Sequence, residues 1–165
     1  ALAKVISEIG KKVLLINTNF RDKSFEKQLK LENIIGISDF IFDKDKELKD
    51  IIHKTSDFKN LDLITIGRRE KCNPAQILVS ERFRLLINKI EEMNYYDLII
   101  FVNSPSIYES DNKLILEFAD AIIYLISTNK VNNKLPKMAM EKIFYNYPHI
   151  GIVVNNYYSN NYIKI

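Results

Sequence analysis

The chain has 165 residues, of which 47% are hydrophobic and 27% charged, values of one globular domain rather than a disordered chain. The formal net charge of +3 is too small to predict a nucleic-acid partner, and no apolar run approaches the ~20 residues that cross a bilayer. The one cysteine, Cys72, excludes an internal disulfide and a cysteine-cluster metal site, so we expect a soluble protein of the reducing cytoplasm.

Short apolar runs alternate along the chain with amphipathic stretches of helix length, which is typical of a parallel α/β sheet. In chain order, the first half predicts a helix at 1–9, a strand at 13–16, short helices within 24–54 and a strand at 61–66. The second half predicts a long helix at 74–93, a strand at 98–102, a helix at 111–118, a strand at 121–126, a helix at 136–145 and a strand at 150–154. Right-handed crossovers between parallel strands would place the helices on both faces of the sheet.

The segment KKVLLINTNFR, which ends at Arg21, carries the clearest chemical signal. Its two lysines, four apolar residues, polar triplet and arginine resemble LLIDADLR, the second nucleotide motif of the MinD/ParA-like P-loop ATPases and the bacterial tyrosine kinases. The resemblance implies that the two aspartates of that motif, which work around the Mg²⁺ of ATP, correspond to Asn17 and Asn19. An amide keeps the shape and hydrogen-bonding capacity of a carboxylate but lacks the negative charge that a hard cation prefers.

Three further stretches resemble the catalytic domain of the bacterial tyrosine kinases (BY-kinases) of capsule and exopolysaccharide export. Residues 31–39, LENIIGISD, are similar to the family's LxNxxGLSD, and residues 73–84, NPAQILVSERFR, to its NPxELL and SERFR segments. Residues 110–111, then Leu114 and residues 119–120, resemble the SDAxxLA…AD helix of the family. The similarity runs nearly end to end, and the stretch at 73–84 favours this family over the ParA and MinD proteins.

The resemblance implies a Rossmann-like, P-loop-type α/β fold, in which a parallel sheet is flanked by helices on both faces. The phosphate-binding loop of the family, GxxxxGK[ST], does not occur in the sequence, and all four glycines match turns or strand ends. We therefore expect the first strand and the P-loop to be missing from this chain, by truncation before Ala1 rather than because the protein never had them.

The Walker B strand of the family, hhhhDTPP, is matched by residues 98–102 and the Asn103-Ser104-Pro105 loop. Val102 stands where the family has its Mg²⁺ aspartate, and a shift by one residue would place the equally neutral Asn103 there. Since Asn17 and Asn19 are neutral too, we expect a catalytically degenerate, pseudokinase-like domain that binds ATP and Mg²⁺ weakly or not at all. The alternatives are an active ATP-dependent tyrosine autokinase and a ParA/MinD-like positioning ATPase.

The C-terminal residues predict two more features. Asn155 lies where related ATPases contact adenine, and it also fits a residue that simply ends a strand. The BY-kinase-like domain is expected to span 1–156, followed by a tyrosine- and asparagine-rich tail at 157–165. The resemblance makes Tyr157, Tyr158 and Tyr162 candidate phosphoacceptors for a neighbouring subunit, and packing of the segment as an extra strand is the alternative.

Glu81, Arg82 and Arg84 carry charge on the helix expected after Pro74. The resemblance implies ring-shaped homo-oligomers, in which these side chains are candidates for intersubunit ion pairs, whereas solvated helix charges explain them equally well. The resemblance also implies a membrane chain-length determinant (polysaccharide co-polymerase) protein as partner, a place at the cytoplasmic face of the membrane, and a regulatory or scaffolding role in polysaccharide export.

Overall fold

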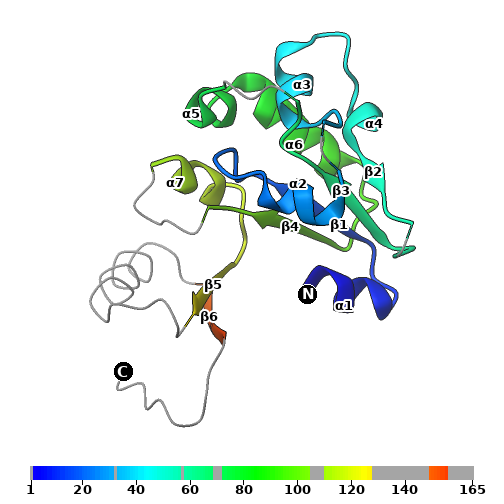
Figure 1. Cartoon of the computed structure of the whole chain (residues 1–165), viewed down its shortest axis with the longest axis vertical. Coiled ribbons are helices and arrows are strands. Elements are labelled where there is room, and N and C mark those ends of the chain that lie inside the picture. Colours follow the sequence, from blue (N-terminus) through cyan, green and yellow to red (C-terminus); the bar gives the residue numbers. More distant parts are fainter. Residues whose placement is uncertain are drawn as a thin grey trace. The chain divides into compact units, whose positions relative to one another are not determined.

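The computed structural model describes residues 2–31, 33–56, 58–68, 72–104, 110–127 and 149–155 (Figure 1). The chain divides into two compact units, Ala1–Ile115 and Leu116–Ile165. The first unit contains a four-stranded sheet with the order β2-β3-β1-β4, and the second contains the two-stranded pair β5-β6. Within the described ranges, every helix falls short of the length and apolar character that crossing a bilayer requires.

The first unit is built from most of the helices and four of the strands. The helices are α1 (Leu2–Glu8), α2 (Ser24–Leu29), α3 (Ile37–Phe42), α4 (Leu48–Ile51), α5 (Pro74–Leu78), α6 (Glu81–Glu92) and α7 (Ser110–Leu116), the last of which ends at the unit boundary. The strands are β1 (Val13–Asn17), β2 (His53–Lys54), β3 (Leu61–Ile64) and β4 (Leu98–Val102). The second unit has β5 (Ile122–Ser127) parallel to β6 (Ile150–Asn155).

Strand β1 lies at the centre of the four-stranded sheet. It runs parallel to β3 and to β4, so Val13 is paired with Leu61 on one side and with Leu98 on the other. Strands buried on both faces are mostly apolar, and β1 and β3 are buried along their lengths, with Asn17 at the end of β1 and Asp62 within β3 as their polar residues. Because these three strands are parallel, their carboxyl ends meet at one edge, where open α/β sheets bind their ligands.

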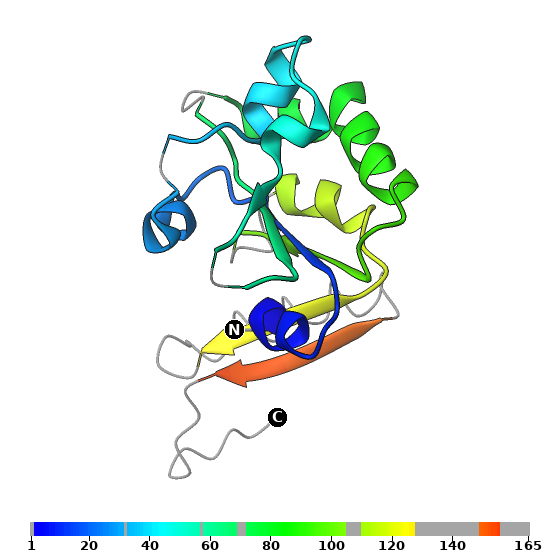
Figure 2. The same ribbon diagram turned by 90° about the vertical axis from the view of Figure 1, so that its right-hand side faces the viewer.

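Helices cover both faces of this sheet, as the sequence predicts. Figures 1 and 2 show α1 on one face, and α3, α4 and α6 on the other. On the α1 side, the buried cluster and the apolar side chains around it are Ala3, Val13, Leu61, Leu63, Ile6, Leu15, Phe25, Leu31, Phe58 and Ile100. The alternate residues of β1, Leu14 and Ile16, are fully buried toward the opposite face. Helix α6 buries Phe83, Leu86, Ile87 and Ile90.

Three predicted elements differ from the structure. The single helix predicted at 74–93 is wrong, because Ser80 is the N-cap of a new helix, α6, and its Oγ accepts a hydrogen bond from Phe83 N (3.1 Å). The segment 24–54 contains a strand as well as helices, since β2 adds an antiparallel edge through the His53–Leu63 pairing. The strand predicted at 61–66 ends at Ile64. The helix predicted at 136–145 lies outside the described residues.

Candidate functional site

The candidate site lies at the carboxyl edge of the sheet, where β1 ends. Asn17 is the last residue of β1 and is paired with Val102, the last residue of β4. Thr18 continues the contact, because its backbone N and its Oγ1 both donate to the Val102 carbonyl, at 2.9 and 3.1 Å. The structure therefore brings together the predicted positions Asn17 and Val102, which are far apart in the sequence.

The Asn17 side chain is fully buried and is held at both ends of its amide. Its Oδ1 accepts a hydrogen bond from Asn19 N (3.0 Å), and its Nδ2 donates to Glu26 Oε1 (2.8 Å). Asn19 repeats the turn pattern one step further, since its Oδ1 accepts from Arg21 N (3.4 Å). Asparagine oxygens commonly close such turns onto the backbone two residues on. In this loop the amides at the motif positions therefore organise the backbone.

Glu26 on α2 is a buried acid at this edge that the sequence analysis did not single out. It is 4% exposed, and its Oε1 accepts hydrogen bonds from Asn17 Nδ2 and from Ile66 N (3.2 Å), just beyond β3. Its other carboxylate oxygen, Oε2, is buried and has no hydrogen-bond partner within the described residues. Glu26 follows closely after the motif that ends at Arg21, and this proximity could have drawn attention to it. The sequence does not show, however, that α2 turns this side chain inward.

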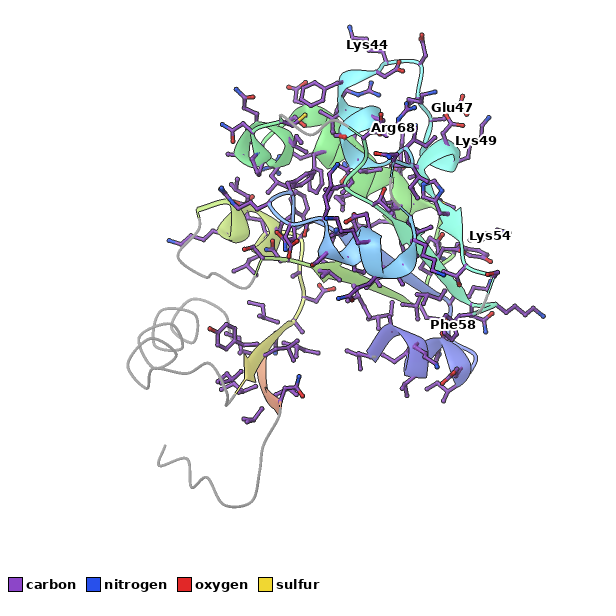
Figure 3. The ribbon with its side chains drawn as sticks, viewed as in Figure 1. Lys44, Glu47, Lys49, Lys54, Phe58 and Arg68 are labelled. Carbon is purple, nitrogen blue, oxygen red and sulfur yellow. The ribbon has the colours of Figure 1, made fainter. Side chains whose placement is uncertain are left out.

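Asp39 is a second buried carboxylate near the same edge, in the LENIIGISD stretch. Its Oδ2 accepts from the backbone N of Gly36 and of Arg68, both at 3.0 Å, and its Oδ1 pairs with Arg68 Nε at 3.1 Å. Figure 3 shows Arg68 beside α3. Every oxygen of Asp39 thus has a donor, and this carboxylate fixes the loop after β3 against the first turn of α3.

Arg82, a predicted interface residue, is engaged inside the chain. Its Nε and Nη2 donate to the Phe40 carbonyl at 2.9 and 2.7 Å, and Nη2 also donates to the Asp43 carbonyl at 3.1 Å. The guanidinium lies 4.7 Å from the centre of the Phe40 ring. Glu81 and Arg84 are exposed on the same helix. The intersubunit role of all three stays a prediction.

The other predicted residues differ in their exposure and contacts. Val102 is half-buried, and the Asn103 side chain accepts a hydrogen bond from Ser104 N (2.9 Å). Arg21 is exposed. Asn155 ends β6 in the second unit, where it is paired with Ser127. The candidate phosphoacceptors Tyr157, Tyr158 and Tyr162 lie outside the described residues.

The capacity of this edge for a metal ion is limited. Among the described residues, no three histidine, cysteine, aspartate or glutamate side chains gather closely enough to hold one by themselves. Mg²⁺ is commonly bound by one or two carboxylates with waters and substrate phosphates, and it does not need an all-protein cage. The orphaned Oε2 of Glu26 fits such a ligand, whereas the Asn17 amide is already used by Asn19 and Glu26.

Comparison with known proteins identifies the relatives of this chain, although no protein-family model matches it. It is 30% identical to the tyrosine-protein kinase YwqD of Bacillus subtilis over 142 residues, which are 86% of this chain and 58% of that protein. It is 32% identical to the tyrosine-protein kinase wzc of Salmonella typhimurium over 133 residues, which are 78% of this chain and 18% of that protein. The chain therefore spans little more than half of one curated relative and under a fifth of the other.

Solved structures show the same fold. The kinase domain of VpsO aligns with a TM-score of 0.82 at 20% identity, over 95% of this chain and 75% of that one. The cell division protein MinD of Aquifex aeolicus aligns with a TM-score of 0.70 at 20% identity, over 96% of this chain and 63% of that one. With the sequence matches to YwqD and wzc, this likeness identifies the chain as a homologue of the bacterial tyrosine-protein kinases, with the P-loop type of α/β fold that kinase domains share with MinD.

Proposed function

We propose that this chain is the kinase-like module of a capsule or exopolysaccharide export system, and that it regulates or scaffolds that system without transferring phosphate. The kinase homology supports the first part of the proposal. The second part is supported by Asn17, whose position is acidic in the nucleotide motif it resembles. Both ends of its buried amide are bound to groups of the chain itself.

The chemistry of phosphoryl transfer explains why this matters. The transfer depends on positioning and on charge stabilisation, to which Mg²⁺ contributes by bridging the phosphates. Asn17 is not a base at any physiological pH, so it does not take the proton of an attacking tyrosine hydroxyl. Val102 has no side-chain oxygen, and its carbonyl already accepts two hydrogen bonds from Thr18. ATP is accordingly expected to bind weakly or not at all.

The assembly is also part of the proposal. We place the module at the cytoplasmic face of the membrane as a homo-oligomer that binds a polysaccharide co-polymerase, the membrane chain-length determinant. The domain is proposed to end at residue 156, and the tail at 157–165 carries the candidate phosphoacceptors Tyr157, Tyr158 and Tyr162. Glu81 and Arg84 remain candidate contacts between subunits because both are exposed on α6.

The test uses the complete protein in which this chain occurs, expressed with its membrane partner. Purified protein is incubated with ATP and MgCl₂, and phosphotyrosine is measured by mass spectrometry while ATP binding is measured by calorimetry. We expect no phosphotyrosine and little or no heat of binding, with the co-polymerase still co-purifying. A variant in which Asn19 and Val102 are changed to Asp, while Asn17 keeps its contact with Glu26, is the matched comparison.

Two results would replace this proposal. Phosphotyrosine on the tail of the unchanged protein would favour the active autokinase. Salt-dependent DNA binding, together with ATP turnover and no co-polymerase binding, would favour a positioning ATPase of the ParA/MinD kind.

A further inference from the structure

The buried carboxylate of Glu26 has one satisfied and one unsatisfied oxygen. Oε1 receives two hydrogen bonds, from Asn17 Nδ2 and Ile66 N, while Oε2 receives none within the described residues. Leaving a buried polar atom without a partner costs about 1–3 kcal/mol, and more for a charged group. Such atoms in native proteins generally face a water, a proton or an ion. Oε2 is therefore open to a ligand that is not a side chain of the described residues.

The position of Glu26 identifies the kind of ligand. The carboxylate joins the ends of β1 and β3 at the carboxyl edge of the sheet, which is the ligand-binding edge of this fold. Neutral oxygen atoms belong to the same loop, namely Asn17 Oδ1, which accepts from Asn19 N, and Thr18 Oγ1, which donates to the Val102 carbonyl. An anionic oxygen among neutral oxygens suits a hard divalent cation, which prefers carboxylate, carbonyl and water ligands.

We propose that Glu26 is a ligand of a divalent cation of the Mg²⁺ class, bound through Oε2 at the carboxyl edge of β1 and β3. The glutamate supplies, from α2, the negative charge that Asn17 and Asn19 do not carry. This cation site does not restore a base for phosphoryl transfer, because Oε1 is occupied by two donors. The inference therefore stands apart from the absence of kinase activity proposed above, and each can fail without the other.

The first experiment measures thermal stability of the complete protein with metal alone, without nucleotide. MgCl₂ is compared with NaCl at equal ionic strength, because screening also changes stability. At a concentration about tenfold above Kd, a bound cation should raise Tm by about 3–6 °C. The variant Glu26→Gln keeps an acceptor for Asn17 Nδ2 and Ile66 N but removes the charge, so the rise should be lost. Glu91→Gln, at an exposed acid of α6, should keep it.

The second experiment locates the cation in the unchanged protein. Fe²⁺ takes the place of Mg²⁺, and peroxide with ascorbate then cleaves the backbone close to the metal. Cleavage is expected near three segments that are distant in sequence, at Asn17, Glu26 and Ile66, and MgCl₂ should protect all three. This map stands by itself if Glu26→Gln does not fold.

The possible outcomes distinguish a cation site at Glu26 from the absence of one. A saturable Mg²⁺ response that disappears in Glu26→Gln and persists in Glu91→Gln, with cleavage at the three segments, supports the site. An equal response in both variants, no response in the unchanged protein, or cleavage centred on the acidic segment at 43–50 would overturn it. In each of those cases Oε2 is bound to water or to a proton only. The phosphotyrosine assay described above is independent of all of these results.

Discussion

Asn17 Nδ2 lies 2.8 Å from Glu26 Oε1, in a hydrogen bond between a fully buried amide and a nearly buried carboxylate. The pair joins the end of the central strand to α2. An amide and a carboxylate form this contact without a counter-ion, whereas two carboxylates at the same distance would repel one another. Asparagine at position 17 is therefore adapted to glutamate at position 26.

The first prediction follows from that pairing. Asn17→Asp, although it restores the acid of the motif, should lower the free energy of unfolding by roughly 3 kcal/mol, because it replaces a donor with a second negative charge. The double variant Asn17→Asp with Glu26→Gln should recover most of the loss, since a glutamine can donate to the new carboxylate. Urea unfolding of the two single variants and the double variant measures the coupling. Additive losses would contradict the pairing.

The second prediction compares two glycines with the same backbone conformation. Gly67 has φ of +95° and Gly10 has φ of +92°, so alanine is strained at both positions. A Cβ at Gly67 would collide with Ser38 Oγ and Asp39 Oδ2, whereas nothing lies within 4 Å of a Cβ at Gly10. Gly10→Ala should cost about 1 kcal/mol, and Gly67→Ala should cost at least twice as much. Equal Tm losses in the two variants would count against the close packing at Gly67.

The third prediction concerns the tie between α6 and the end of α3. Arg82→Met removes the donors to the Phe40 and Asp43 carbonyls while keeping much of the apolar stem. Charge-assisted hydrogen bonds contribute about 1.5–3 kcal/mol, so a loss in that range is expected in urea unfolding. Lys89→Met, at an exposed position of the same helix, should change stability by less than about 0.5 kcal/mol. An Arg82→Met variant with unchanged stability would show that the fold does not need these hydrogen bonds.

The fourth prediction is a pH dependence at the opposite end of the strands. A hydrogen bond from the Lys12 backbone N–H, at 2.8 Å, is the largest cause that holds the pKa of Asp97 below its usual value, and Lys11 adds to the effect. A carboxylate whose pKa is lowered on folding stabilises the protein above its unfolded pKa of about 3.9 and loses that contribution as pH falls through its folded pKa. Asp97→Asn should thus be less stable than the unchanged chain at pH 7.

The measurement for Asp97 is urea unfolding of the two proteins at a series of pH values. Their difference in stability should be constant from pH 7 to about pH 5 and should shrink below about pH 4. Asp45→Asn, at an exposed residue, is the control for general acid effects. A difference that persists unchanged at pH 2 would rule out the lowered pKa as its origin.

Much of the fold was predictable because the sequence of its central strands has a recognisable apolar pattern. Strands β1, β3 and β4 are dominated by large aliphatic residues, with Asp62 as the charged residue within β3, and such runs are typical of strands in a parallel sheet. The break between α5 and α6 was not predicted, because the buried apolar residues on either side of it, Ile77, Leu78 and Phe83, fit one helical face, while the hydroxyl of Ser80 caps a new helix. Strand β2 has only two residues, too short for any alternation to show.

The site was predicted only in part, for a physical reason. Asn17 and Val102 could be named from motif spacing, and register brings them together. Glu26 could not be identified from the sequence, because its contact with Asn17 depends on how α2 packs over the end of β1. That packing is a tertiary property. The sequence predicts that Arg82 is a charge at an interface between subunits. It does not predict the carbonyl partners of Arg82, because they lie at the end of α3, about forty residues earlier in the chain.

The position of β1 between β3 and β4 also decides when this domain can fold during synthesis. Val13 leaves the ribosome long before either of its strand partners, Leu61 and Leu98. At bacterial rates of elongation, the wait for Leu98 is on the order of ten seconds. During that interval the central strand of the sheet has an unpaired backbone. Val13–Asn17 is therefore the segment on which a nascent-chain chaperone has the longest time to act.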